Sequence, residues 1–226
     1  MNPAHDKLHC PKGIIFDLDG TLVDSLSLTF EAFNHGIVHC GSRPHTPDEI
    51  TAYFGTGEDR IFAKLVGEDR AHEAYTAYSD YLDEHMGRIP LHAEVSELLD
   101  ALRNRSIPIS IVTGRSWNTT ELILKHHELL DRFVTVIAND HVSRPKPAPE
   151  GILLALSRMG LKPEEAFYVG DSTVDILAAR AAGSRSVAAL WDFLANQDTL
   201  EAHSPHRSAA SPSEVLSIWN EWTTQV

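Results

Sequence analysis

Residues 12–25 read KGIIFDLDGTLVDS and pass from an apolar run into two carboxylates, Asp17 and Asp19. An apolar run bounded by Gly13 and Gly20 is typical of a short buried strand. Ligands of parallel sheets bind beyond the carboxyl ends of the strands, where both acids would lie. Residues two apart in an extended segment share a face, so a divalent cation would offset the repulsion between the two carboxylates. The alternative is an ordinary acidic turn, for which Asp and Gly are common residues.

The chain after residue 89 alternates helical and apolar strand patterns, which is typical of a parallel sheet covered on both faces. The pattern predicts four further strands, at residues 107–112, 133–137, 166–169 and 185–190. We expect residues 191–210 to be irregular. A short helix is expected from Ser211, because Ser211 and Glu214 have the spacing of a capping box.

Residues 24–88 have a different character, with helical patterns and no convincing strand. A segment of this length is too long for a simple crossover between parallel strands. We therefore predict an inserted helical subdomain at 24–88, with residues 1–23 and 89–226 forming the α/β core.

Polar residues follow each strand expected in the core. Thr113 follows the second strand, Lys146 lies near the end of the third, and Asp171 and Asp175 follow the fourth. Taken one at a time, each has an ordinary explanation: Thr113 and Asp171 could be turn residues, and Lys146 could be a solvated lysine. Together they would gather at one sheet edge with Asp17, because parallel strands all end on the same side. Carboxylate oxygens suit Mg²⁺. We expect Lys146 and both the hydroxyl and the backbone N–H of Thr113 to contact the oxygens of a transferring phosphoryl group.

Composition and charge exclude several classes of protein. The chain has 19 Lys and Arg and 32 Asp and Glu, which gives a net charge of −13. This charge argues against a general binder of nucleic acid or anionic membranes. No apolar segment is long enough to span a bilayer, and the first residues lack the core of a signal peptide, so a cytoplasmic location is expected. Cys10 and Cys40 are expected to be free thiols. His35 and His39 have helical ligand spacing, but no further ligand motif supports a zinc site.

Four segments together resemble the motifs of the haloacid dehalogenase-like hydrolases: residues 17–25, Thr113, residues 146–149 and residues 170–175. The resemblance spans about residues 12–190, with the motifs in the family's order. It implies a Rossmann-like, doubly wound parallel sheet with an α-helical cap inserted after the first motif. It further implies magnesium-dependent hydrolysis of a small phosphorylated metabolite by a monomer or homodimer.

The resemblance also implies a role for each matching residue. Asp17 would be the nucleophile that forms an aspartyl-phosphate, and Asp19 the general acid and then base. Asp171 would bind magnesium with the Asp17 carboxylate and the Asp19 backbone carbonyl, and Asp175 would support the site. The phosphoryl group would be held by Thr113 and Lys146, with Gly20 and Gly114 beside them.

The leaving group depends on the cap, and the sequence is most similar to the phosphoglycolate phosphatase-like branch. Residues 55–57 and Arg60 are expected to form the cap loop that faces the site. There Arg60 or Lys64 could bind a substrate carboxylate or a second phosphate, or could simply lie at a solvated helix start. Arg115 is interpreted as a helix cap in preference to a place near the substrate. A sugar-phosphate mutase would use the same Asp17. A non-catalytic phospho-receiver module is the alternative from another class, although it needs neither Asp19 nor an insertion.

Overall fold

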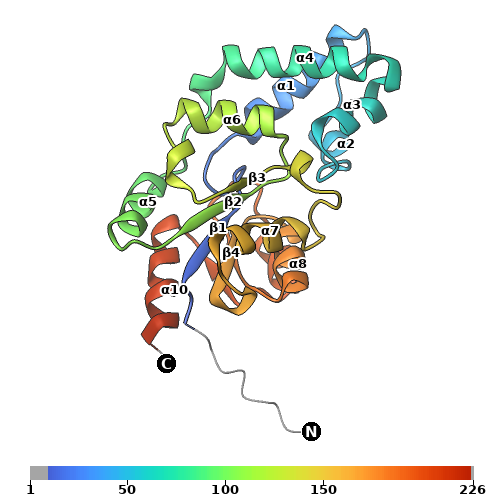
Figure 1. Cartoon of the computed structure of the whole chain (residues 1–226). Helices are drawn as coiled ribbons and strands as arrows, with labels where there is room; N and C mark the ends of the chain where they lie inside the picture. Colours follow the sequence, from blue (N-terminus) through green and yellow to red (C-terminus); the bar gives the residue numbers. More distant parts are fainter. Residues whose placement is uncertain (1–9, 225–226) are drawn as a thin grey trace, which may run out of the picture.

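The computed structural model describes residues 10–224 and has a sheet of six parallel strands at its centre (Figure 1). The strand order is β3-β2-β1-β4-β5-β6, with β1 in the middle. The strands are β1 (Gly13–Phe16), β2 (Ile109–Val112), β3 (Val136–Ile137), β4 (Ala166–Gly170), β5 (Arg185–Ala189) and β6 (Arg207–Ala209). The predicted α/β class and doubly wound sheet are confirmed.

Successive residues of β1 point into two different hydrophobic clusters, which explains why the whole strand is apolar. Ile14 and Phe16 pack in one cluster and Ile15 in the other, and all three are fully buried. Helices cover both faces of the sheet, as Figure 1 shows, with α7 and α8 on one side and α5 and α10 on the other. The core helices are α5 (Val95–Asn104), α6 (Trp117–His126), α7 (Glu150–Met159), α8 (Thr173–Ala182), α9 (Gln197–Ala202) and α10 (Pro212–Thr224). Short 3-10 turns occur at Leu130–Arg132, Asn139–His141 and Pro163–Glu165.

Between β1 and α5 the chain forms a helical insertion beyond the carboxyl end of the sheet (Figure 1). Its helices are α1 (Leu26–His39), α2 (Pro47–Thr51), α3 (Glu58–Val66) and α4 (Glu68–Glu84), followed by a 3-10 turn at Met86–Arg88. We call this part the cap and the rest the core. Gly36 lets α1 approach α4 closely, because a Cβ there would lie 2.3 Å from the Ala74 carbonyl oxygen. Two connections join cap to core side by side, with the amide of Asp24 donating to the Pro90 carbonyl at 3.0 Å.

The segment after β5 is more ordered than the sequence indicated. Residues 191–210, expected to be irregular, contain α9 and the sixth strand β6. β6 pairs with β5 along one edge only and its first residue, Arg207, is exposed. Such a short edge strand is held by backbone hydrogen bonds and carries little apolar alternation, so its pattern is hard to recognise. Within residues 10–224, no helix combines the length and hydropathy required to cross a membrane.

Candidate active site

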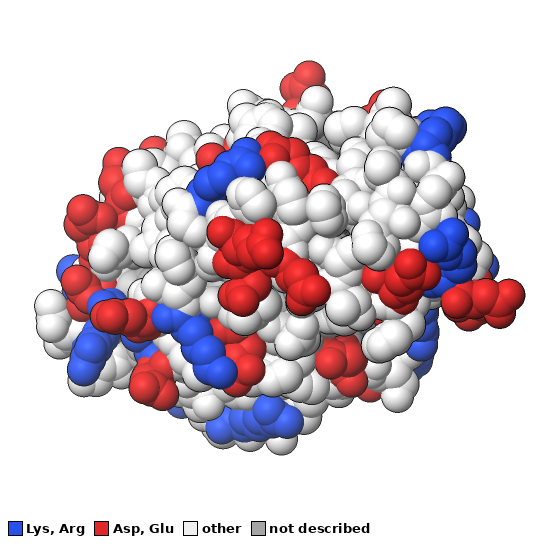
Figure 2. Space-filling model, turned by 90° about the horizontal axis from the view of Figure 1, so that it is seen from above, with Lys and Arg blue, Asp and Glu red and all other residues white. Residues whose placement is uncertain are grey.

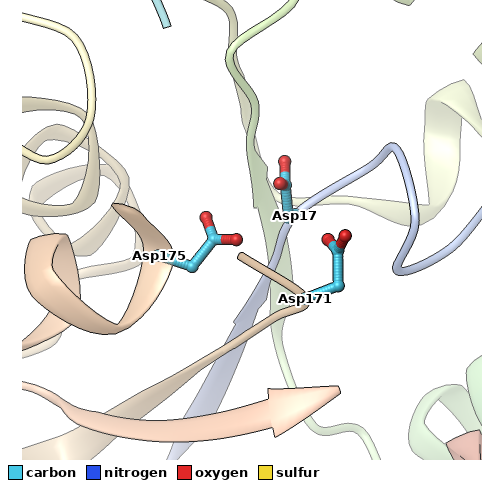
Figure 3. Close-up of side chains that lie close together, drawn as sticks. All are labelled: Asp17, Asp171 and Asp175. Carbon is cyan, nitrogen blue, oxygen red and sulfur yellow. The ribbon is translucent and has the colours of Figure 1, made fainter. Parts of the chain in front are cut away.

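Three carboxylates converge at the carboxyl edge of the sheet (Figure 3). Asp17 follows β1, Asp171 follows β4, and Asp175 lies in the first turn of α8. One oxygen from each lies within 4.8 Å of the others, a spacing and donor set that fit a hard divalent cation such as Mg²⁺. Gly20 closes the turn beside them with φ 73°, and a Cβ there would lie 2.3 Å from Asp171 Oδ2. Glycine is therefore required at this position by both conformation and space.

The three carboxylates of this cluster repel one another when they are ionised. Burial, with the neighbouring Asp175 and Asp19 charges adding to it, raises the pKa of Asp17 to about 7 although Lys146 opposes the shift. Burial and the charges of Asp175 and Asp17 raise the pKa of Asp171 well above its usual range. A bound divalent cation would favour the ionised form of both groups. The three carboxylates are therefore consistent with a divalent-cation site and do not form an ordinary acidic turn.

Lys146 reaches the same point from the loop before α7. Its ammonium lies 2.9 Å from Asp17 Oδ2 and donates to Asp175 Oδ1 at 2.7 Å and to the Tyr168 hydroxyl at 3.1 Å. Burial would lower the pKa of Lys146, but the Asp17 and Asp175 charges raise it, so the lysine stays protonated. Tyr168, which the sequence did not single out, anchors this arrangement by donating to the Val112 carbonyl at 2.6 Å. A buried tyrosine in a strand carries no sequence signal beyond that of an ordinary core residue.

Thr113 lies where expected, at the end of β2, but only part of it is available to a ligand. Its backbone N–H donates to the Ile137 carbonyl at 2.9 Å, so our expectation that this N–H contacts phosphate is wrong. Strand pairing with β3 continues one residue past β2 and occupies that donor. The hydroxyl accepts from the Arg115 amide at 3.2 Å and keeps its own proton for donation. Both Thr113 and Gly114 line the cavity described below.

The carboxylate of Asp19 faces Arg115 rather than the three-carboxylate cluster. Arg115 Nη2 donates to Asp19 Oδ1 at 2.6 Å and Nε to Oδ2 at 3.0 Å, a two-pronged pair, and the Ser25 hydroxyl also donates to Oδ1. Burial acts to raise the pKa of Asp19, but the Arg115 charge and hydrogen bonds bring it below its usual value. The preference for Arg115 as a helix cap is thus corrected, because its guanidinium holds Asp19 in the site.

Arg115 also ties the core to three helices of the cap. It donates to the Thr29 hydroxyl of α1 and to the Tyr78 hydroxyl of α4, each at 2.8 Å. Glu58, the first residue of α3, lies 3.9 Å from the guanidinium and accepts from the Ser116 amide at 2.7 Å and the Thr119 hydroxyl at 2.8 Å. Sequence reasoning missed Glu58 and Tyr78. Their partners belong to a distant segment, and no local pattern reports such contacts.

Replacing Arg115 with methionine is expected to lower the free energy of unfolding by about 3 kcal/mol, because the buried Glu58 and the partly buried Asp19 would lose their cation. Urea unfolding of both proteins measures this difference. The matched control is Arg43→Met, which removes an exposed pair with Glu49 and should cost no more than about 1 kcal/mol. Equal costs for the two variants would contradict the structural role of the buried pair.

A cavity of about 410 Å³ lies between cap and core, over the carboxylates. Asp17, Asp19, Lys146 and Asp171 line it, so the residues predicted from four strand ends open into one space. Asp175 does not line it, because this fully buried carboxylate lies behind Lys146. Four residues of the segment after β5 also line the cavity: Leu194, Asn196, Thr199 and Leu200.

Arg60 is exposed and lies outside the set of residues that line the cavity, unlike Gly55 of the preceding loop. The loop rests on the core, since Asn139 Nδ2 donates to the Gly55 carbonyl at 3.1 Å.

Comparison with known proteins assigns the family. Residues 14–189 match the family model described as haloacid dehalogenase-like hydrolase. The chain is 31% identical to the pyrophosphatase PpaX of Bacillus velezensis over 91% of this chain and 94% of that protein. It is 28% identical to the phosphoglycolate phosphatase of Aquifex aeolicus over 91% and 95%.

A solved structure is similar in fold across almost the whole chain. The crystal structure of a predicted phosphoglycolate phosphatase from Haemophilus somnus has a TM-score of 0.82 at 23% identity, covering 93% of this chain and 99% of that one. The motif order, the sheet topology and the family match agree. The chain belongs to the haloacid dehalogenase-like hydrolases.

Proposed function

We propose that this protein is a magnesium-dependent phosphatase that hydrolyses a small phosphate monoester through an aspartyl-phosphate on Asp17. The observation that carries this proposal is the position of Asp17, which lies beside the Lys146 ammonium and the Asp171 carboxylate and lines the cavity between cap and core. With a divalent cation bound beside it in addition to Lys146, the Asp17 carboxylate would be ionised and able to attack phosphorus. The relatives named as phosphatase and pyrophosphatase support a phosphorylated substrate.

In the first step, a carboxylate oxygen of Asp17 attacks the phosphorus and the bond from phosphorus to the ester oxygen breaks. The departing oxygen takes a proton from Asp19. Lys146 and the Thr113 hydroxyl donate to the phosphoryl oxygens, whose charge must be stabilised during transfer. Asp19 can act here only when protonated, so its pair with Arg115 must loosen as substrate binds.

In the second step, Asp19 accepts a proton from water, and the resulting oxygen attacks the phosphorus of the aspartyl-phosphate. The bond between phosphorus and the Asp17 oxygen breaks, which releases phosphate and restores the carboxylate. The pair with Arg115 favours the ionised form of Asp19, which is the form that a general base requires. Closure of the cap over the cavity would limit the access of bulk water during both steps.

Magnesium would be held by the carboxylates of Asp17 and Asp171 and by the backbone carbonyl of Asp19. When bound, the ion supplies positive charge that offsets the crowded carboxylates and draws in phosphoryl oxygens. Asp175 supports the site indirectly, because it fixes Lys146 and accepts from the Ser172 amide at 3.0 Å.

The proposal predicts steady release of phosphate from small phosphate monoesters only while a divalent cation is present. The assay compares phosphate release from a panel, including phosphoglycolate, pyrophosphate and hexose phosphates, with magnesium and with excess EDTA. Activity unaffected by EDTA would contradict the proposed cofactor. Return of the phosphoryl group to a second position of a sugar, without free phosphate, would instead identify a mutase. A stable phosphorylated Asp17 without turnover would identify a receiver module.

A further inference from the structure

The walls of the cavity differ from its floor in chemical character. Apolar side chains from both cap and core line the space above the carboxylates: Leu26, Phe33, Phe54, Ile61, Leu194 and Leu200. The volume of about 410 Å³ lies within the usual range for small-molecule sites, about 300–1,000 Å³, and exceeds the needs of a phosphoryl group alone. Much of the cavity is therefore available to the leaving group, and its walls favour apolar surface.

The charges that line the cavity leave no cation for a second anionic group. Four carboxylates face two cations, and both cations are engaged. Lys146 pairs with Asp17 and Asp175, and Arg115 donates to Asp19, Thr29 and Tyr78. A divalent cation would balance the lining charge, and the phosphoryl group then adds its own negative charge. Any further negative charge on the substrate would meet Glu58 and Asp19 without a free partner among the described lining residues.

The mouth of the cavity continues the apolar surface outward. Phe54, at the cap side, is 40% exposed, and Leu194, at the core side, is 46% exposed. The Phe54 ring is stacked 6.1 Å from that of Phe30 and lies 6.2 Å from that of Phe33, which holds it at the rim. Exposed large apolar residues at the entrance of a pocket are typical of ligand contact.

The face of the molecule seen from above has no broad positive area that would attract polyanions. Figure 2 shows the molecule from above, with basic and acidic side chains interspersed among uncharged ones on this face. This agrees with the net charge of −13. Arg60, the cap cation considered for a second anionic group, lies outside the cavity lining.

We infer that the substrate of this site is a phosphate monoester whose alcohol portion is uncharged and largely apolar, an inference that rests on the proposed phosphatase function. The phosphoryl group lies over Asp17 and Lys146, and the alcohol portion lies against the apolar walls between cap and core. This sets the chain apart from its relatives named for pyrophosphate and phosphoglycolate, whose leaving groups carry negative charge. It also replaces the phosphoglycolate-like substrate that the sequence suggested.

The test compares two esters that differ in one distant charge, benzyl phosphate and 4-carboxybenzyl phosphate, alongside phosphoglycolate and pyrophosphate. With the full chain and magnesium, kcat/KM for benzyl phosphate should exceed that for the carboxylated ester at least about tenfold. Equal values, or a preference for the carboxylated ester, phosphoglycolate or pyrophosphate, would overturn the inference and leave the phosphatase function standing. Phosphate release from no member of the panel would overturn the proposed function itself.

A pair of charge variants ties this selectivity to the cavity. Leu194→Arg places a cation in the cavity lining. It should lower the ratio of kcat/KM for benzyl phosphate to kcat/KM for its carboxylated analogue several-fold. The matched control is Phe193→Arg, the same change at a neighbouring side chain that is 64% exposed and does not line the cavity. It should leave the preference unchanged. An equal effect of both variants would show that general surface charge, not this pocket, sets selectivity.

Discussion

Asp17→Asn is expected to lower kcat for phosphate release at least about 10⁴-fold, because the amide cannot act as the attacking carboxylate. Asparagine matches aspartate in shape, and it removes one negative charge from a crowded cluster in which burial and neighbouring acids already disfavour ionisation. The fold should therefore survive. Thermal unfolding followed by circular dichroism checks this, and released phosphate measures the activity.

The control for this change is Asp80→Asn, which removes an exposed carboxylate from α4 outside the cavity lining and should leave turnover unchanged. Mass spectrometry of protein quenched during turnover should find a phosphoryl group on Asp17 in the native chain and none in the variant. Full turnover by Asp17→Asn would disprove the nucleophilic role.

Asp19→Asn is expected to lower kcat for alkyl phosphates by about 10²–10⁴-fold, the usual contribution of a general acid or base. With p-nitrophenyl phosphate, the rate of the first step should fall less in this variant, because p-nitrophenolate leaves without needing a proton. Pre-steady-state release of p-nitrophenol separates that step from hydrolysis of the aspartyl-phosphate. The variant should show a burst of p-nitrophenol, since the second step still lacks its base.

Magnesium dependence separates this role from metal binding. The Asp19 side chain does not belong to the three-carboxylate cluster, and only its backbone carbonyl is proposed as a ligand. The magnesium concentration for half-maximal activity should therefore change little in Asp19→Asn. It should rise strongly in Asp171→Asn, which loses a proposed ligand. Similar shifts in both variants would argue that Asp19 holds the metal rather than moving protons.

Arg115 gives these predictions a common physical basis. It neutralises Asp19 while it anchors three cap helices, so the cap position and the state of the general acid are linked through one side chain. A change in the cap that displaces Tyr78 or Thr29 also alters the surroundings of Asp19. In the proposed mechanism, substrate selection by the cap and proton transfer by Asp19 would therefore not be independent.

Sequence patterns were sufficient for the α/β class, the helical insertion and the convergence of Asp17, Lys146 and Asp171. Each of these follows from local order along the chain, because parallel strands bring every strand end to one edge. The patterns were less informative for the segment after β5. There, backbone pairing of β6 and the packing of α9 against the core depend on neighbours far away in sequence.

The sequence by itself determined that Asp17 and Asp19 follow a buried strand of a parallel sheet, because the strand, the turn and the spacing of the two acids are local properties. Only the tertiary structure decided how those acids differ. Asp17 forms an ion pair with Lys146, whereas Asp19 forms one with Arg115. Arg115 in turn donates hydrogen bonds to the cap. The tertiary structure also decided that Phe54 and Leu194, and not Arg60, line the cavity over the carboxylates. Such contacts form only when cap and core pack together, and the burial and pairing of each charge follow from that packing.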